Sequence, residues 1–280
     1  MVIRTTLALL LIVACGTSTD AKGTPTAGSA KPPAADSSRA KAILDAQIAA
    51  IKSGDEAALT GTFSSDAIVL VPDPRSAQAK TTGLREAIAR LAPGEALKSF
   101  TVTKVVANAN ASAVWWSAEC SVTSTKATTT IRLTELATAD ASWKVVAGAF
   151  AEVRPAEAAA DASPIEDKST TAAGPLTPLS GDAAQLDSHV ASSAVVFGTD
   201  KGEAAFDAAA AHKLLKGWTK LKLSVPGKSR ELHGKEWGFA ITNVDWQQPK
   251  EKVPARMSAL VIGTPTGDGW QVVAAQYTAN

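Results

Sequence analysis

The chain has few of the residues that build disulfide frameworks, metal sites or acid–base sites. It contains two cysteines, three histidines and one tyrosine among 280 residues. Two cysteines cannot make a disulfide framework, and the histidines (189, 212 and 233) lack the spacing of metal ligands. Phosphate-binding glycine loops, nucleophile elbows and Cys-x-x-Cys pairs are also missing. The sequence therefore predicts no metal, no cofactor and no recognisable catalytic motif.

Neither sign of charge dominates the chain. There are 28 basic and 27 acidic residues, and loss of residues 1–14 would remove only Arg4. A protein that binds nucleic acid needs a basic surface to neutralise phosphates. We therefore expect no nucleic-acid partner. The hydrophobic share of 45% is globular, although only 5% of the residues are aromatic.

A long apolar run is missing too, and the short one near the amino terminus predicts export. Arg4 is followed by apolar residues 7–13, whereas a spanning helix needs about 20 such residues. Ile12-Val13-Ala14-Cys15 resembles the lipobox of bacterial lipoproteins, in which the cysteine is acylated and becomes the mature amino terminus. This implies a signal peptide over residues 1–14 and lipid attachment at Cys15. Gly16 implies the outer membrane in a host with two membranes. The alternative is an ordinary signal peptide with an incidental cysteine.

Residues 15–37 predict a flexible tether. They are rich in Gly, Thr, Ser, Pro, Ala and Lys and show no apolar periodicity, so they cannot bury enough surface to offset the entropy of ordering. If Cys15 carries lipid, Cys120 has no partner within the chain, and we expect it to be a small buried side chain.

The most informative feature that is present is a repeat with an offset of 127 residues. Gly54-Asp55 recurs as Gly181-Asp182, and Trp143-Lys144-Val145-Val146-Ala147 recurs as Trp270-Gln271-Val272-Val273-Ala274. Solenoid repeats are much shorter, about 20–50 residues. The repeat predicts two tandem domains over residues 38–153 and 181–280, with a linker over 154–180.

Apolar periodicity predicts mixed α and β structure in both halves. The first half predicts helices over 42–51, from 55 and over 83–91, and strands over 67–71, 100–106, 113–122, 128–136 and 143–153. The second half predicts a helix over 206–218 and strands over 194–197, 220–225, 236–246, 255–263 and 269–278. Residues 165–180 contain two prolines and a glycine, so the second half is expected to lack the first helix.

The first half resembles the nuclear-transport-factor-2-like superfamily, which includes the polyketide-cyclase (SnoaL-like) and ketosteroid-isomerase families. Phe63-Ser64-Ser65-Asp66-Ala67-Ile68, Pro72, Gly83-Leu84-Arg85-Glu86-Ala87-Ile88 and Trp143-Lys144-Val145-Val146 carry the resemblance. It implies an α+β fold with two tandem cone-shaped domains. Each would be a curved antiparallel sheet packed on helices, with a cavity between them and the second domain truncated.

Strand alternation separates the candidate residues of the first half into two sets. Trp116 shares a face with the apolar residues of its strand, so it is a candidate for the cavity wall together with Phe150 and Asp66. Trp115 and Glu119 fall on the opposite face. In related domains this outer face pairs two copies, and here the two halves would pair within one chain as a pseudo-dimer. The alternative is that Trp115 is a partly exposed strand residue.

These features predict a lipid-anchored protein of the bacterial envelope with two non-catalytic domains that bind a small apolar ligand or an envelope protein. The alternative is an isomerase, cyclase or hydrolase acting on a small apolar molecule in the first cavity. Its acids would come from Asp66, Glu86, Glu119 and Glu135, with Asp66 or Glu119 as the base. The isomerase chemistry of the family also uses a tyrosine donor, and the sole tyrosine, Tyr277, lies in the second half.

Overall fold

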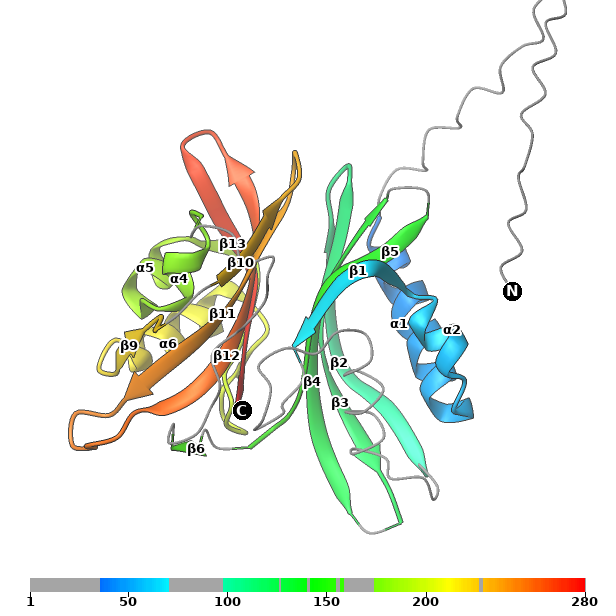
Figure 1. Cartoon of the computed structure of the whole chain (residues 1–280), viewed down its shortest axis with the longest axis horizontal. Coiled ribbons are helices and arrows are strands. Elements are labelled where there is room, and N and C mark those ends of the chain that lie inside the picture. Colours follow the sequence, from blue (N-terminus) through cyan, green and yellow to red (C-terminus); the bar gives the residue numbers. More distant parts are fainter. Residues whose placement is uncertain are drawn as a thin grey trace, which may run out of the picture. The chain divides into compact units, whose positions relative to one another are not determined.

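A computed structural model describes residues 36–70, 98–125, 127–139, 142–154, 157–158, 174–226 and 229–279. All of them belong to one compact unit, Pro32–Asn280. Two sheets divide this unit into a first lobe, residues 36–154, and a second lobe, residues 157–279 (Figure 1). The signal peptide, most of the tether and the predicted helix over 83–91 lie outside the described residues.

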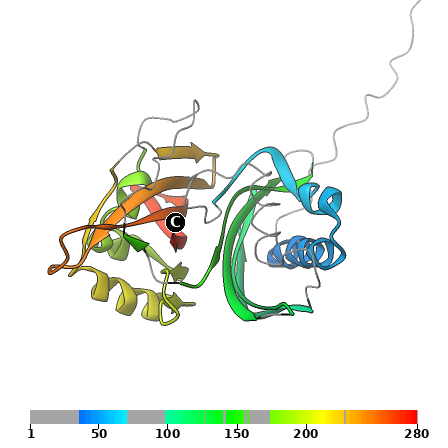
Figure 2. The ribbon, with the colours of Figure 1, turned by 60° about the horizontal axis from the view of Figure 1, so that its bottom comes forward.

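The first lobe is a five-stranded sheet that curves around a helix (Figure 2). Its elements are α1 (Ser37–Ser53), α2 (Glu56–Thr60), β1 (Phe63–Leu70), β2 (Ser99–Ala109), β3 (Ala113–Thr123), β4 (Thr128–Ala139) and β5 (Trp143–Glu152). The strand order is β1-β5-β4-β3-β2. Strands β2 to β5 pair antiparallel as expected, whereas β1 pairs parallel with β5.

The second lobe repeats this topology. Its elements are β6 (Glu157–Ala158), α4 (Thr177–Ser180), α5 (Ala183–Ser188), β7 (Val190–Phe197), β8 (Ala204–Ala205), α6 (Ala208–Trp218), β9 (Lys222–Ser224), β10 (Ser229–His233), β11 (Gly238–Gln247), β12 (Ala255–Thr266) and β13 (Gly269–Ala279). Strand β7 pairs parallel with β13, and β13, β12 and β11 follow antiparallel. The sequence did not predict β10, which extends the sheet beyond β11.

The repeated Gly-Asp pair marks the junction of two helices in the first lobe. Gly54 ends α1 in a left-handed conformation, with φ of 68°, which glycine adopts without steric cost. Asp55 then caps α2 by accepting a hydrogen bond from the Ala58 N–H at 2.9 Å. In the second lobe Asp182 caps α5 in the same way. The described residues before it form only the four-residue α4, as the two prolines and the glycine predicted.

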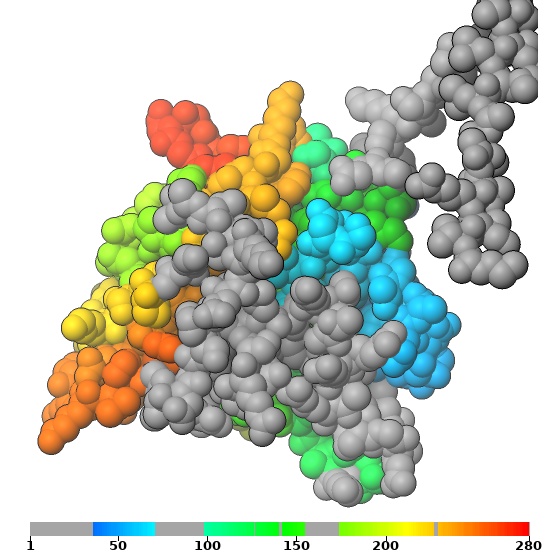
Figure 3. Space-filling view, viewed as in Figure 1, coloured from blue at the N-terminus to red at the C-terminus, as the bar shows by residue number. Residues whose placement is uncertain are grey.

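The two helices α1 and α2 cover the concave face of the first sheet. Apolar residues of α1, among them Leu44, pack on buried residues of β1 to β5. Trp116 and Cys120 on β3 lie in this core and are fully buried, which confirms the alternation predicted for that strand. The opposite sides of α1 and α2 form part of the surface (Figure 3). In the second lobe α4, α5 and α6 cover the sheet in a separate core.

A third cluster of buried residues joins the two sheets on their other faces. From the first sheet it takes Trp115 and Leu136, and from the second it takes Phe239 and Ile262. Trp237 packs against the cluster, whereas Trp246 packs in the core of the second lobe. The outer faces of the two sheets therefore cover each other, with this apolar cluster beside buried polar residues such as Ser117 and Thr134.

Arg132 on β4 makes several hydrogen bonds between the lobes. Its guanidinium donates to the carbonyl oxygens of Gly198 and Asp200, both at 2.9 Å, and of Lys201 at 3.0 Å. Its Nε also donates to Glu119 at 3.2 Å. The side chain is 2% exposed, and burial lowers the pKa of the guanidinium while Glu119 opposes that change.

Taken together, the chain has the predicted α+β fold with two curved sheets, each packed on helices, the second without a long first helix. None of the described helices is both long and apolar enough to cross a bilayer.

Candidate functional site

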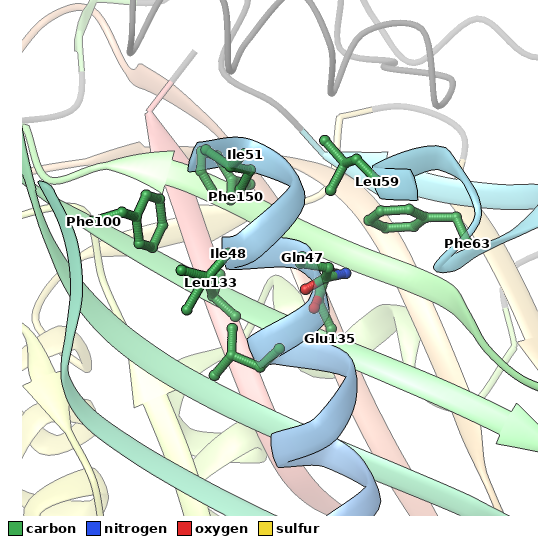
Figure 4. A pocket seen from close by; sticks show the side chains of 10 residues that line it. Gln47, Ile48, Ile51, Leu59, Phe63, Phe100, Leu133, Glu135 and Phe150 are labelled. Atoms are coloured by element: carbon green, nitrogen blue, oxygen red, sulfur yellow. The ribbon is translucent and has the colours of Figure 1, made fainter. Parts of the chain in front are cut away.

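A pocket lies between α1 and the concave face of the first sheet (Figure 4). It is lined by Leu44, Gln47, Ile48, Ile51, Leu59, Phe63, Phe100, Leu133, Glu135 and Phe150. It encloses about 300 Å³ of space, including its opening to solvent. The space inside it that a water molecule can occupy is much smaller, with room for about one water molecule.

Glu135 is the one ionisable side chain among the described residues that line this pocket. It lies on β4 between Trp116 on β3 and Gly148 on β5. Its Oε1 accepts a hydrogen bond from Gln47 Nε2 at 3.0 Å, whereas its Oε2 is buried with no partner among the described residues. A buried polar atom without a partner is costly, and in a native protein it points to a water or a ligand.

The orientation of Gln47 is fixed by a chain of hydrogen bonds. Thr62 donates its hydroxyl proton to the Leu59 carbonyl at 2.7 Å, so its oxygen is free to accept. Gln47 Nε2 donates to that oxygen at 3.3 Å and to Glu135 at 3.0 Å. Both amide protons are therefore used, and the amide oxygen of Gln47 accepts from none of the described residues.

Burial raises the pKa of the Glu135 carboxyl from 4.5 to about 8. The hydrogen bond from Gln47 and the nearby indole of Trp116 oppose the rise. The Trp116 N–H does not reach hydrogen-bond geometry with any described residue, and it lowers the pKa of Glu135 less than Gln47 does. Glu135 is accordingly mostly protonated at pH 7. A carboxyl titrating near neutral pH in a pocket can bind a ligand or transfer a proton.

Gly148 provides the space that Glu135 occupies. A Cβ built at this position would lie 3.3 Å from the Cγ of Glu135 and 3.6 Å from a methyl of Val69. Alanine at position 148 would require Glu135 to move by a few tenths of an ångström.

The second lobe shows that the fold does not require a polar group here. A row of paired residues crosses the first sheet at Glu135, namely Val69, Gly148, Glu135 and Trp116. The matching row of the second sheet is Val196, Ala275, Val261 and Ala240. The offset between the rows is 127 residues on the first two strands, 126 at Val261 and 124 at Ala240, because the loops differ in length. Valine thus occupies in the second lobe the place of Glu135.

The residues predicted for the cavity lie in different places. Phe150 lines the pocket, and Trp116 lies beside Glu135 in the core. Asp66 is exposed on β1 outside the lining, and a hydrogen bond from the Ser64 hydroxyl lowers the pKa of its carboxyl. Trp115 and Glu119, predicted for the domain interface, lie in the apolar cluster between the sheets and beside Arg132 respectively.

The sequence analysis placed Glu135 only among the possible acids and did not identify Gln47. A signal for Glu135 is present, because it follows Ile131 and Leu133 at alternate positions of one strand. The pairing with Gln47 carries no such signal, since the two residues are 88 positions apart.

Two buried polar residues of the second lobe have structural partners, whereas several others, among them the Trp116 N–H and the Gln276 amide oxygen, have an atom without one among the described residues. In the second lobe Tyr277 donates to the Ser180 carbonyl at 3.0 Å, and burial raises the pKa of its hydroxyl. Glu231 accepts from the N–H groups of Leu176 and Thr177 and pairs with His233 at 2.8 Å. Across the described part of the chain, no three histidine, cysteine or acidic residues are grouped to hold a metal ion.

Burial raises the pKa of the Cys120 thiol to about 12. Two nearby carboxyls, those of Glu119 and Glu135, add to this rise. Cys120 is therefore an inert core residue at neutral pH.

No protein-family model matches the chain, and no curated protein matches it. Among solved structures, it is similar to an NTF2-like protein of unknown function from Pseudomonas putida, at 10% identity and a TM-score of 0.35 over 47% of this chain and 95% of that one. It is also similar to a ketosteroid isomerase-like protein from Erwinia carotovora, at 18% identity and a TM-score of 0.32 over 41% and 94% of the two chains. Similarity at this level identifies no activity.

Proposed function

We propose that the protein is a lipid-anchored binding protein of the bacterial envelope whose first lobe holds a small, mainly apolar molecule. The observation that supports this most directly is the unpartnered, fully buried Oε2 of Glu135 in an apolar pocket. Keeping such a group costs stability, and the matching valine in the second lobe avoids that cost. A function for the carboxyl is the simplest reason to retain it.

A co-purifying ligand is the expected result for the pocket. The full-length protein, extracted from its host in nonionic detergent, should show an additional small-molecule mass in native mass spectrometry. The variant Glu135→Val has at this position the valine that the second lobe has at Val261. Its spectrum should lack the additional mass, because the polar contact with the ligand is gone. Asp45→Asn changes an exposed carboxylate of α1 and serves as the control. Identical spectra for all three proteins would contradict a pocket ligand held by Glu135.

The membrane anchor is proposed on the lipobox-like residues that end at Cys15. Two or more acyl chains hold a protein firmly on a bilayer, whereas the nearly neutral chain offers little electrostatic attraction. Cys15→Ser should therefore move nearly all of the protein from the membrane fraction to the soluble fraction. Fractionation and intact-mass measurement test this, and a Cys15→Ser protein that remains in the membrane fraction would argue against acylation.

A second candidate is an enzyme that uses Glu135 as a general acid or base. The raised pKa of this carboxyl favours it, because a catalytic acid or base works best with a pKa near the operating pH. No other ionisable side chain among the described residues lines the pocket, so a partner for a two-group mechanism is missing there. Binding without catalysis is therefore the function that we propose first.

A further inference from the structure

The polar part of the first-lobe pocket consists of two oxygen atoms. Oε2 of Glu135 is buried without a partner, and the amide oxygen of Gln47 accepts no hydrogen bond from the described residues. Gln47 cannot present a donor instead, since Thr62 and Glu135 occupy both of its amide protons. When Glu135 is ionised, the described residues that line the pocket thus offer acceptors only, while the N–H of Trp116, which lies beside Glu135, is outside that lining.

The apolar part of the pocket is rich in aromatic rings. Phe63, Phe100 and Phe150 all line it, each from a different strand (Figure 4). The faces of aromatic rings attract cations, and groups of aromatic rings are used to recognise ammonium ions. At the position of Phe63 the second lobe has Val190.

Charge balance distinguishes between ligand classes. Among the described residues, no lysine or arginine contributes to the pKa shift of Glu135. A ligand that brings one positive charge would compensate an ionised Glu135, whereas a carboxylate ligand would add a second negative charge to a buried site.

Resting on the binding function proposed above, we infer that the pocket recognises a small aliphatic ammonium ion. Its N–H groups donate to Glu135 Oε2 and Gln47 Oε1, and its alkyl chain extends along the phenylalanine and aliphatic lining toward the opening of the pocket. The space that a water molecule can occupy has room for about one small group, so a primary ammonium fits better than a quaternary one.

Binding of the ammonium ion is linked to ionisation of Glu135. Below the pKa of about 8, the carboxyl of the empty pocket carries a proton, and formation of the ion pair releases this proton to solvent while the ammonium keeps its own. The other titratable group coupled to Glu135 among the described residues is the Cys120 thiol on β3. With a pKa of about 12, this thiol stays neutral throughout.

The test is isothermal titration calorimetry of the full-length protein in nonionic detergent with n-butylammonium chloride, 1-butanol and 2-butanone. We expect butylammonium to bind at least about tenfold more tightly than either neutral probe at pH 7, as a charge-assisted hydrogen bond implies. Buffers of different ionisation enthalpy should report the release of about one proton. The affinity should rise about tenfold between pH 6 and 7 and level off above pH 8.

Two variants and one control complete the test. Glu135→Gln keeps the shape of the side chain and should weaken butylammonium binding at least about tenfold, with no proton release. Gln47→Leu should weaken it less, and Asp45→Asn should leave it unchanged. If a variant does not fold, the proton release and pH profile of the natural protein still decide the result.

The possible outcomes separate this inference from the proposed function. The ammonium inference would be overturned if butanone or butanol bound more tightly than butylammonium, or if the affinity for butylammonium did not change with pH. The pocket would then remain a binding site for neutral molecules. Binding of none of the three probes at millimolar concentration would overturn both, with water alone filling the pocket.

Discussion

Replacement of Arg132 by methionine is expected to lower the free energy of unfolding by about 3–5 kcal/mol, the range for removal of one partner from a buried ion pair. The side chain is 2% exposed and donates to Glu119 and to three carbonyl oxygens of the loop over residues 198–201. Methionine would leave these acceptors without a donor. Urea denaturation followed by tryptophan fluorescence measures the loss, because Trp115 is buried in the cluster between the sheets.

Two comparisons make this result interpretable. Lys41→Met removes an exposed ion pair with Asp45, with side chains 71% and 58% exposed, and should change the stability by less than about 1 kcal/mol. Arg132→Lys keeps the charge but cannot supply the forked donors, so most of the loss should remain. A cost below about 1 kcal/mol for Arg132→Met would mean that the guanidinium contributes little to joining the lobes.

The second large effect is a dependence of stability on pH that comes from Glu135. Its pKa is about 8 in the folded protein and 4.5 as the reference value for the unfolded chain. Between these two values the folded protein binds one proton more than the unfolded chain, so stability falls as the pH rises. The contribution is fully present below pH 4.5 and is lost as the pH reaches 8. A shift of this size corresponds to about 5 kcal/mol.

The measurement is the free energy of unfolding from pH 4.5 to 8.5 for the natural protein and for Glu135→Gln. The variant has no ionisable group at this position, so the difference between the two curves should change by several kcal/mol across the range, with the variant favoured at high pH. Asp45→Asn, which changes an exposed carboxylate of α1, should follow the natural curve. Parallel curves for the natural protein and Glu135→Gln would contradict the raised pKa.

Local patterns were sufficient to predict most elements. The alternation of apolar residues located β3, β4 and β5 in the first lobe and β12 and β13 in the second to within a few residues. The short helix expected from residue 55 is present, capped by Asp55, because a capping side chain acts on its own neighbours. Strand β10 was missed, since its five residues are defined by pairing with β11 rather than by their own pattern.

The pocket depended on information that no local pattern contains. The sequence candidates for the base were Asp66 and Glu119, yet Asp66 is exposed on β1 and Glu119 pairs with Arg132. Alternate residues of β4 face α1, and Glu135 is one of them. Gln47 lies on α1, which ends at Gly54. Only the packing of α1 on the sheet brings these two side chains within 3.0 Å.

The sequence by itself determined the α+β class and the repeat of 127 residues, because composition, periodicity and short motifs can be read along a chain without its fold. The lipid anchor at Cys15 stays a prediction. Tertiary structure alone decided which carboxyl lies in the pocket with a raised pKa. Burial raises the pKa of Glu135 and pairing places it opposite Gly148, whereas the matching row of the second lobe holds Val261. Both effects depend on atoms that are distant along the chain, and desolvation acts only after those atoms have assembled.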